Sequence, residues 1–204
     1  MKIWDLSTRL YHWTQALLFF GLVSTAYLGV AAHWHPTLGI AMAALVFWRI
    51  GWGFIGSETS RFAYFIPSPL RLWRYLKGQQ PNTVGHNPLG SLMVLLLLTL
   101  LIVQSLTGLL MTDWLHSLPI PRATTRNLES LHNINSKLLM GAVLIHLSAI
   151  VWHEGKGHRL VSIMITGRSV ETSPLRPFFV NSLRSISLLI VVILLFVILL
   201  SLLA

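Results

Sequence analysis

The sequence predicts an all-α integral membrane protein, and three observations indicate this fold class. Of its 204 residues, 54% are hydrophobic and only 10% are charged. The mean hydropathy of +0.68 is far too apolar for a water-soluble domain of this length. Apolar windows of about 20 residues, the length that crosses a bilayer as a helix, recur along the chain between polar and proline-containing segments.

Five of these windows are long enough to span a membrane. They fall at 10 to 31, 36 to 55, 89 to 111, 131 to 152 and 183 to 204. Polar and aromatic side chains interrupt the first four, which is typical of membrane helices that pack on one another. The fifth is almost entirely aliphatic and predicts a lipid-facing helix. We therefore expect a four-helix bundle over residues 1–168, followed by a linker and an extra C-terminal transmembrane helix over residues 169–204.

The connections between these windows are polar or amphipathic. The longest follows the second window and contains LRLWRYLKG after Pro67, a basic amphipathic stretch that we expect to lie in the membrane interface. The segment GHNPLG precedes the third window, and its Asn87 and Pro88 are start signals for a helix. We expect the first window to be a retained helix, because no small-residue cleavage pattern follows it.

The basic residues predict how the chain is oriented. The net charge is +9, but in a membrane protein lysine and arginine first indicate the cytoplasmic side. In the five-span arrangement one side holds Lys2, Arg9, Arg49, Arg61, Arg71, Arg74, Lys77, Lys156, Arg159, Arg168, Arg176 and Arg184, and the other holds only Arg122, Arg126 and Lys137. We therefore expect a multi-pass protein of the bacterial inner membrane with a cytoplasmic N-terminus. The excess positive charge then contacts lipid and does not indicate a nucleic-acid partner.

The absence of cysteine limits the cofactors that the chain can bind. Because the chain contains no cysteine, it has no thiolate ligands for zinc or iron–sulfur clusters and no covalent attachment site for c-type haem. A bound metal must therefore rely on histidine, methionine or carboxylate ligands. The nine histidines outnumber the six acidic residues, and histidine within the hydrocarbon region is a functional candidate by default.

Four histidines match in pairs at two depths of the predicted bundle. His132 and His146 lie 14 residues apart, on one face of a helix and about 21 Å apart along it. His12, near the start of the first window, is level with His146, and His35, at the start of the second, is level with His132. Two histidine pairs at two depths suit two haems b, each held by two imidazoles. A zinc or copper site would need more ligands at one depth.

Other histidines compete less well for these positions. His33 lies two residues from His35 and therefore on a different helix face, so the choice between them stays open, with His35 preferred because it enters the apolar run. We expect His153 and His158 to be interfacial or solvated, His116 to lie in the outer loop, and His86 to be interfacial, where it could also touch a haem propionate or a quinone. Arg9, Arg126 and Lys137 are candidate partners of haem propionates, although each taken alone also fits a solvated charge.

Several segments in order resemble a known family. They are WDLSTRLYHW, HPTLGIAMAALVFWRIGWGFIGS, GHNPLGSLMVLLLLTLLIVQSLTGLL, LHNINSKLLMGAVLIHL and MITGR. The chain resembles the bacterial cytochrome b561 family, which also contains the b-type cytochrome subunits of membrane nickel–iron hydrogenases, over residues 3 to 168. The resemblance implies a four-helix haem-binding bundle with ligands at His12, His35, His132 and His146.

The resemblance also implies electron transport in a respiratory chain. Members of this family pass electrons between membrane quinones and partner proteins such as periplasmic c-type cytochromes or hydrogenases. With histidine on both sides of each iron, we expect electron transfer without an open position for substrate. The alternative is a haem-free membrane anchor or small transporter whose histidines pack or shuttle protons. The sequence leaves open the direction of electron flow, the quinone site, the oligomeric state and the role of the fifth helix.

Overall fold

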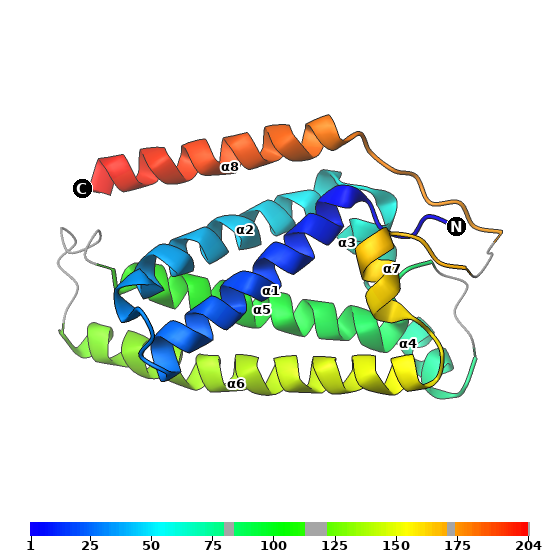
Figure 1. Cartoon of the computed structure of the whole chain (residues 1–204), viewed down its shortest axis with the longest axis horizontal. Helices are drawn as coiled ribbons and strands as arrows, with labels where there is room; N and C mark the ends of the chain where they lie inside the picture. Colours follow the sequence, from blue (N-terminus) through cyan, green and yellow to red (C-terminus); the bar gives the residue numbers. More distant parts are fainter. Residues whose placement is uncertain (80–83, 113–121, 171–173, 204) are drawn as a thin grey trace.

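The chain folds into helices. The computed structural model describes residues 1–79, 84–112, 122–170 and 174–203, and within these ranges all regular structure is helical apart from one isolated β-bridge between Lys2 and Arg168. Figure 1 shows the long helices running side by side, with the N-terminus and the short helices α3, α4 and α7 at one end. The all-α class predicted from composition is confirmed.

Each predicted window overlaps one long helix. The long helices are α1 (Leu6–Tyr27), α2 (His35–Ile55), α5 (Pro88–Leu110), α6 (Arg122–Gly155) and α8 (Ser182–Leu203). Short elements lie between them: η1 (Ala32–Trp34), η2 (Glu58–Ser60), α3 (Phe62–Phe65), α4 (Pro69–Leu76) and α7 (Leu160–Thr166). The amphipathic stretch after Pro67 is thus a helix, α4, whose Leu70, Trp73 and Leu76 are exposed.

Among the described residues, three helices are long and apolar enough to cross a membrane. These are Ala32–Ile55, Pro88–Leu110 and Ala123–Gly155. Helix α1 has 22 residues, about 33 Å at 1.5 Å per residue, which also matches the hydrocarbon thickness of a bilayer. In α8 the apolar stretch Ser182–Ile198 is shorter. The arrangement with five spans therefore stays a prediction.

Side-chain caps determine where two of the long helices begin. The Asp5 carboxylate accepts a hydrogen bond from the backbone N–H of Thr8 at 2.6 Å, so α1 begins four residues before its apolar window. The Asn87 side chain accepts from the backbone N–H of Gly90 at 2.7 Å, and Pro88 occupies the first turn of α5. The start signals predicted for this helix are confirmed.

Helices that follow one another in the chain also pack against one another. Helix α1 packs on α2, α2 on α5, and α5 on α6. Helices α1 and α6 meet through side chains, including a 2.8 Å hydrogen bond between the hydroxyls of Tyr27 and Ser136. A buried apolar cluster joins α2, α5 and α6; its members are Met42, Val46, Leu98, Leu101 and Leu139. Many outward-facing leucine, isoleucine and valine side chains are exposed, as expected of a surface in contact with lipid.

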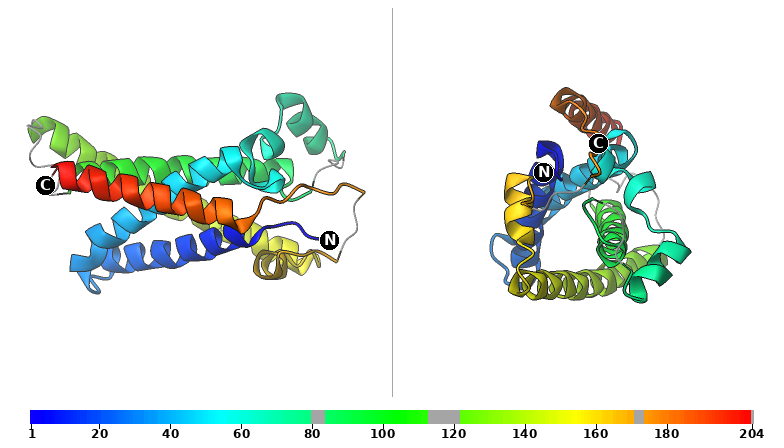
Figure 2. Two further views of the ribbon diagram at one scale, coloured as in Figure 1. Left: turned by 90° about the horizontal axis from the view of Figure 1, so that it is seen from above. Right: turned by 90° about the vertical axis from the view of Figure 1, so that its right-hand side faces the viewer.

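Helix α8 lies outside the group formed by α1, α2, α5 and α6 (Figure 2) and packs chiefly on α2. Its Val192 side chain is buried against Trp48 and Trp52. The Trp48 indole N–H donates a hydrogen bond to the Ser185 carbonyl at 3.2 Å. The fifth helix is therefore an addition to the outer face of α2.

Gly53 allows an aromatic ring to approach α2, and this gives a first prediction. A Cβ atom at residue 53 would lie 2.1 Å from Cε2 of Phe62, and the Phe62 ring is held between Phe54 and Phe65. We expect Gly53→Ala to lower the free energy of unfolding by about 1–3 kcal/mol through overpacking, measured by thermal unfolding in detergent. Gly155→Ala is the control, because nothing lies within 4 Å of its added Cβ. Equal melting temperatures for the two variants would contradict the prediction.

Candidate functional site

His12 and His146 face each other from α1 and α6 near the end of the bundle that holds the N-terminus. Their ring centroids are 6.5 Å apart and their ring planes are inclined by 59°. The Trp13 ring packs edge-on against His12 at 5.2 Å. Among the described residues, Nδ1 of His12 is buried and has no hydrogen-bond partner. The structure thus brings together two imidazoles that are 134 residues apart in the chain.

The separation of these rings fits one metal ion between two imidazoles. Metal–imidazole bonds are about 2.0–2.1 Å long, and a ring nitrogen lies about 1 Å from its ring centre. Two rings on opposite sides of one metal are therefore about 6 Å apart from centre to centre. No group of three or more His, Cys, Asp or Glu side chains with metal-binding geometry occurs in the described part of the chain. A metal in this position would need a cofactor that supplies its other ligands, as a porphyrin does.

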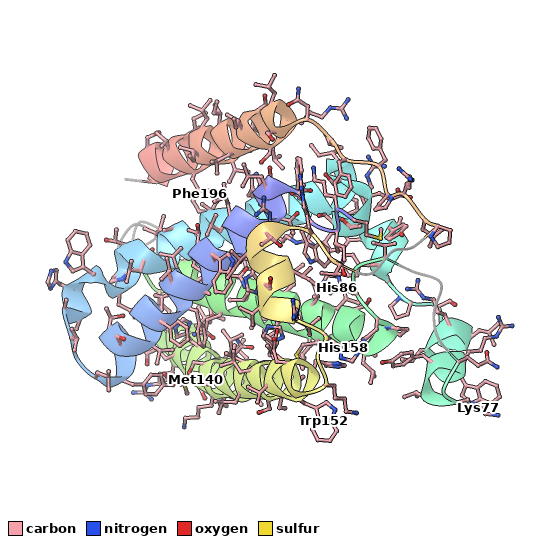
Figure 3. All side chains as sticks on the ribbon, turned by 45° about the vertical axis from the view of Figure 1, so that its right-hand side comes forward. Lys77, His86, Met140, Trp152, His158 and Phe196 are labelled. Carbon is pink, nitrogen blue, oxygen red and sulfur yellow. The ribbon has the colours of Figure 1, made fainter. Side chains whose placement is uncertain are left out.

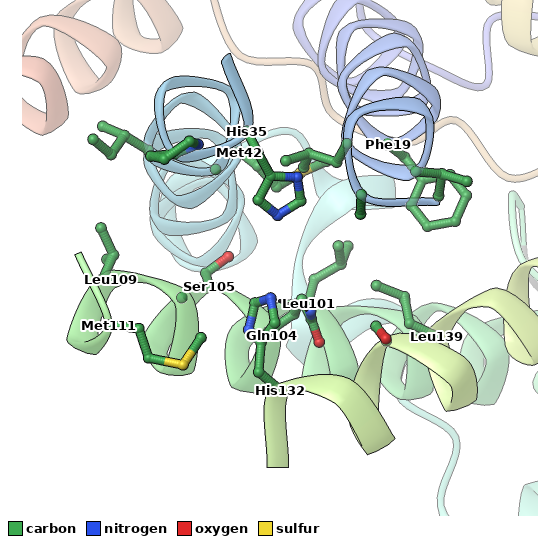
Figure 4. Close-up of a pocket in the computed structure, with 18 of the residues that line it drawn as sticks. Phe19, His35, Met42, Leu101, Gln104, Ser105, Leu109, Met111, His132 and Leu139 are labelled. Carbon is green, nitrogen blue, oxygen red and sulfur yellow. Dashed lines mark hydrogen bonds between the residues drawn. The ribbon is translucent and has the colours of Figure 1, made fainter. Parts of the chain in front are cut away.

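His35 and His132 lie at the opposite end of the bundle, where a cavity of about 440 Å³ opens between α1, α2, α5 and α6. Both rings project into this cavity (Figure 4), which is lined mainly by apolar side chains such as Phe19, Leu101 and Leu139. Its volume is in the range of sites for organic ligands and cofactors. Gly108 of α5 makes room for the His132 ring, because a Cβ there would lie 3.2 Å from Cε1 of that ring.

A threonine fixes the tautomer of His35. The Thr25 hydroxyl donates its single hydrogen to the Leu22 carbonyl at 2.9 Å and lies 2.8 Å from Nδ1 of His35. With the hydroxyl hydrogen on the Leu22 carbonyl, the matching tautomer of His35 carries its hydrogen on Nδ1 and donates it to the threonine oxygen. The Nε2 lone pair of His35 is then free to bind a metal.

A second threonine acts on His132 in the same way. The Thr107 hydroxyl donates to the Val103 carbonyl at 2.8 Å and lies 2.9 Å from Nδ1 of His132. The Nδ1–H group of His132 therefore donates to Thr107, and its Nε2 is an acceptor. The side-chain amide of Gln104 donates to this Nε2 at 2.9 Å, and Asn135 donates to the Gln104 oxygen at 2.7 Å. The amide thus uses the same lone pair that a metal would use.

The two histidine pairs lie at different levels of the molecule. Helix α6 is continuous from Arg122 to Gly155 and carries both His132 and His146, so the two rings are about 21 Å apart along one helix axis. Neither pair can share a metal with the other across this distance. The two histidine pairs are therefore separate from each other within the bundle.

The remaining histidines lie outside these two sites, with one exception. His33 is exposed in η1 and does not line the cavity that His35 enters. His153 and His158 contact each other at 5.2 Å near the end of α6, where His158 is exposed. His116 lies outside the described residues. The exception is His86, which packs on Trp4 at 4.7 Å and on Phe65 at 5.5 Å and interacts electrostatically with His146 and His12.

The basic residues that the sequence suggests as partners of haem propionates have the following surroundings in the structure. Arg9 donates from Nη1 to the carbonyl of Ile165 and so joins α1 to α7. Arg126 and Lys137 are exposed on α6. A further guanidinium group, that of Arg49 on α2, is only 5% exposed and interacts electrostatically with His86, as His12 and His146 do. Sequence reasoning counted Arg49 only among the charges of one membrane side, although its position within an apolar window was a signal of burial.

Comparison with known proteins identifies relatives over most of the chain. The sequence model of the family described as prokaryotic cytochrome b561 matches residues 3–167. A probable Ni/Fe-hydrogenase B-type cytochrome subunit of Rhodobacter capsulatus is 24% identical over 212 residues, covering 81% of this chain and 79% of the relative. A protein of the same description from Rhizobium leguminosarum bv. viciae is 21% identical, covering 81% and 87%. No solved structure matches the chain.

The threonine contact predicts a measurable contribution of Thr107 to stability. We expect Thr107→Val to lower the free energy of unfolding by about 1–3 kcal/mol, because the Nδ1–H group of His132 loses its acceptor inside the bundle. Thr112→Val is the matched control, since among the described residues that hydroxyl, just after the end of α5, donates to the nearby Leu109 carbonyl and contacts no histidine. Thermal unfolding of both variants in detergent measures the difference. A Thr107→Val protein as stable as the control would show that the contact contributes nothing.

Proposed function

Because the chain belongs to the prokaryotic cytochrome b561 family, it is a membrane b-type cytochrome of electron transfer, and we propose that it holds two haems. One haem is held by His12 and His146, and the other by His35 and His132. The observation that carries this proposal is the 6.5 Å separation of the His12 and His146 rings. The cavity that receives His35 and His132 supports the second site.

In this proposal the protein side chains bind the two haems and keep water away from them. A b-type haem with imidazole on both sides of its iron supplies one-electron transfer and leaves no iron position open to substrate. Thr25 and Thr107 hold His35 and His132 with Nε2 directed away from the threonine, and a hydrogen-bonded Nδ1–H group makes each imidazole a stronger ligand. Gln104 must release Nε2 of His132 before that atom can bind iron. The apolar lining of the cavity excludes water from the site.

We propose that electrons pass between a membrane quinone and a redox partner protein. The curated relatives have names that describe cytochrome subunits of Ni/Fe hydrogenases, which favours a hydrogenase-like enzyme as partner, with a periplasmic c-type cytochrome as the second candidate. The N-terminus, α3, α4 and α7 lie at the basic end of the bundle (Figure 1). By the positive-inside rule this end faces the cytoplasm of a multi-pass inner-membrane protein.

Haem content tests the proposed ligands. We expect a pyridine haemochrome assay on the purified protein to give close to two haems b per chain. The variants His146→Ala and His35→Ala should each lose one haem, because each removes one axial ligand. The neighbouring variants His153→Ala and His33→Ala are the matched controls and should keep two. Absence of haem from the unmodified protein would instead support the haem-free anchor or transporter.

Reduction by quinol tests the proposed electron donor or acceptor. We expect a short-chain ubiquinol or menaquinol, added anaerobically to the oxidised protein in lipid vesicles, to produce the absorbance of reduced b-type haem. His146→Ala should respond with fewer reduced haems, because one of its sites is empty. Stopped-flow absorbance measures both the extent and the rate. A haem-loaded protein that neither quinol reduces, and whose reduced form neither quinone oxidises, would contradict the exchange with quinone.

A further inference from the structure

In the described part of the chain, Arg49 is a buried cation without an ion pair, and it shares a neighbour with the proposed site, because Arg49, His146 and His12 all interact electrostatically with His86. Arg49 is 5% exposed, and its guanidinium carbon lies 5.3 Å from the Phe62 ring centroid and 5.8 Å from that of Phe65. Its Nη1 is fully buried, and among the described residues it has no hydrogen-bond partner. The two aromatic rings therefore lie against the guanidinium group but leave its Nη1 without an acceptor.

The acidic groups near Arg49 do not supply the missing partner. Tyr11 and Asp5 interact electrostatically with Arg49, but no salt bridge joins Asp5 to it in the described part of the structure. One oxygen of Asp5 caps α1 by accepting from Thr8, and the other is buried without a hydrogen bond. A guanidinium group in an apolar interior is strongly destabilising unless an anion accepts from it. Arg49 therefore has the surroundings of a residue that binds an anionic ligand.

A second buried nitrogen without a hydrogen-bond partner in the described part of the chain lies close to Arg49. His86 is in contact with Phe65, the same ring that faces the guanidinium group, and its buried Nδ1 has no partner in the described part of the chain. Burial lowers the pKa of His86 to about 3, and the charges of Arg49, His146 and His12 act in the same direction. His86 is therefore neutral and close to the proposed haem ligands. Figure 3 shows it within the body of the molecule, whereas Lys77 on α4 extends away.

The chemistry of this cluster fits a carboxylate. A guanidinium edge binds a carboxylate through paired hydrogen bonds, and a neutral imidazole N–H can donate to the same group. Haem b carries two propionate carboxylates at one edge of the ring. We propose that Arg49, assisted by His86, binds a propionate of the haem held by His12 and His146. This inference rests on the proposed function, because it takes the haem in that position as given.

Haem with esterified propionates tests this inference directly. In a His35→Ala background, which keeps only the His12 and His146 site, the apoprotein is titrated with haem b and with haem b dimethyl ester, followed by Soret absorbance. We expect tighter binding of the free acid by about tenfold or more, the size of a charge-assisted hydrogen bond. Arg49→Gln should bring the two affinities close together. Arg49→Lys, which keeps the charge but not the paired donors, should give an intermediate ratio.

Two further measurements complete the test. Arg74→Gln is the matched control, because Arg74 is exposed on α4 and its loss should leave the preference for the free acid unchanged. In the protein with all four histidines, Arg49→Gln should lower one of the two haem midpoint potentials and leave the other in place, because a nearby positive charge favours the reduced haem. This readout needs no His35→Ala background.

The outcomes separate this inference from the function on which it rests. If the parent protein binds haem and its dimethyl ester equally well, or if Arg49→Gln retains the preference and both midpoint potentials, the propionate site is overturned while the di-haem proposal stands. If the protein with all four histidines binds no haem, the proposed function fails first. Retained preference in Arg74→Gln together with loss in Arg49→Gln supports the inference.

Discussion

The structure depends on one constraint: polar ring nitrogens inside an apolar helix bundle need defined partners. Thr25 and Thr107 satisfy this need by the same device, since each hydroxyl gives its hydrogen to a carbonyl of its own helix and then accepts from a histidine. The protonated ring nitrogen is thereby assigned before any cofactor enters. The second nitrogen of His132 also has a partner, because Gln104 donates to it and Asn135 in turn donates to the Gln104 oxygen.

Helix α6 gives the bundle its two levels. It is longer than a bilayer requires, with 34 residues, and it carries one histidine of each pair. The partners come from α1 and α2, which are joined by η1, so one helical hairpin and one long helix contribute all four rings. Helix α5 contributes no histidine, but its Thr107 and Gln104 hydrogen-bond to the His132 ring. Its Gly108 lacks a side chain and so leaves space for that ring.

The sequence predicted the helices and the meeting of distant histidines, but several supporting residues could not be found in it. Hydropathy located five helices, yet α6 begins nine residues before its window because its first turns are polar and hydropathy does not detect them. The depth of each histidine follows from helix rise alone, whereas the threonine contacts depend on how α1 and α5 are rotated about their axes. Arg49 was treated as a charge at the membrane surface, because the pocket formed by Phe62 and Phe65 depends on the fold of the loop after α2.

The spacing of His132 and His146 on α6 has a consequence for energy conversion. An electron that passed between haems at these two proposed levels would travel about 21 Å along the α6 axis, roughly two thirds of a hydrocarbon layer that is about 30 Å thick. A transmembrane voltage then acts on the transfer with about 1.5 kcal/mol per 100 mV. With the two proposed haems at these levels, the height of four helical turns would make electron flow through the protein sensitive to the membrane potential.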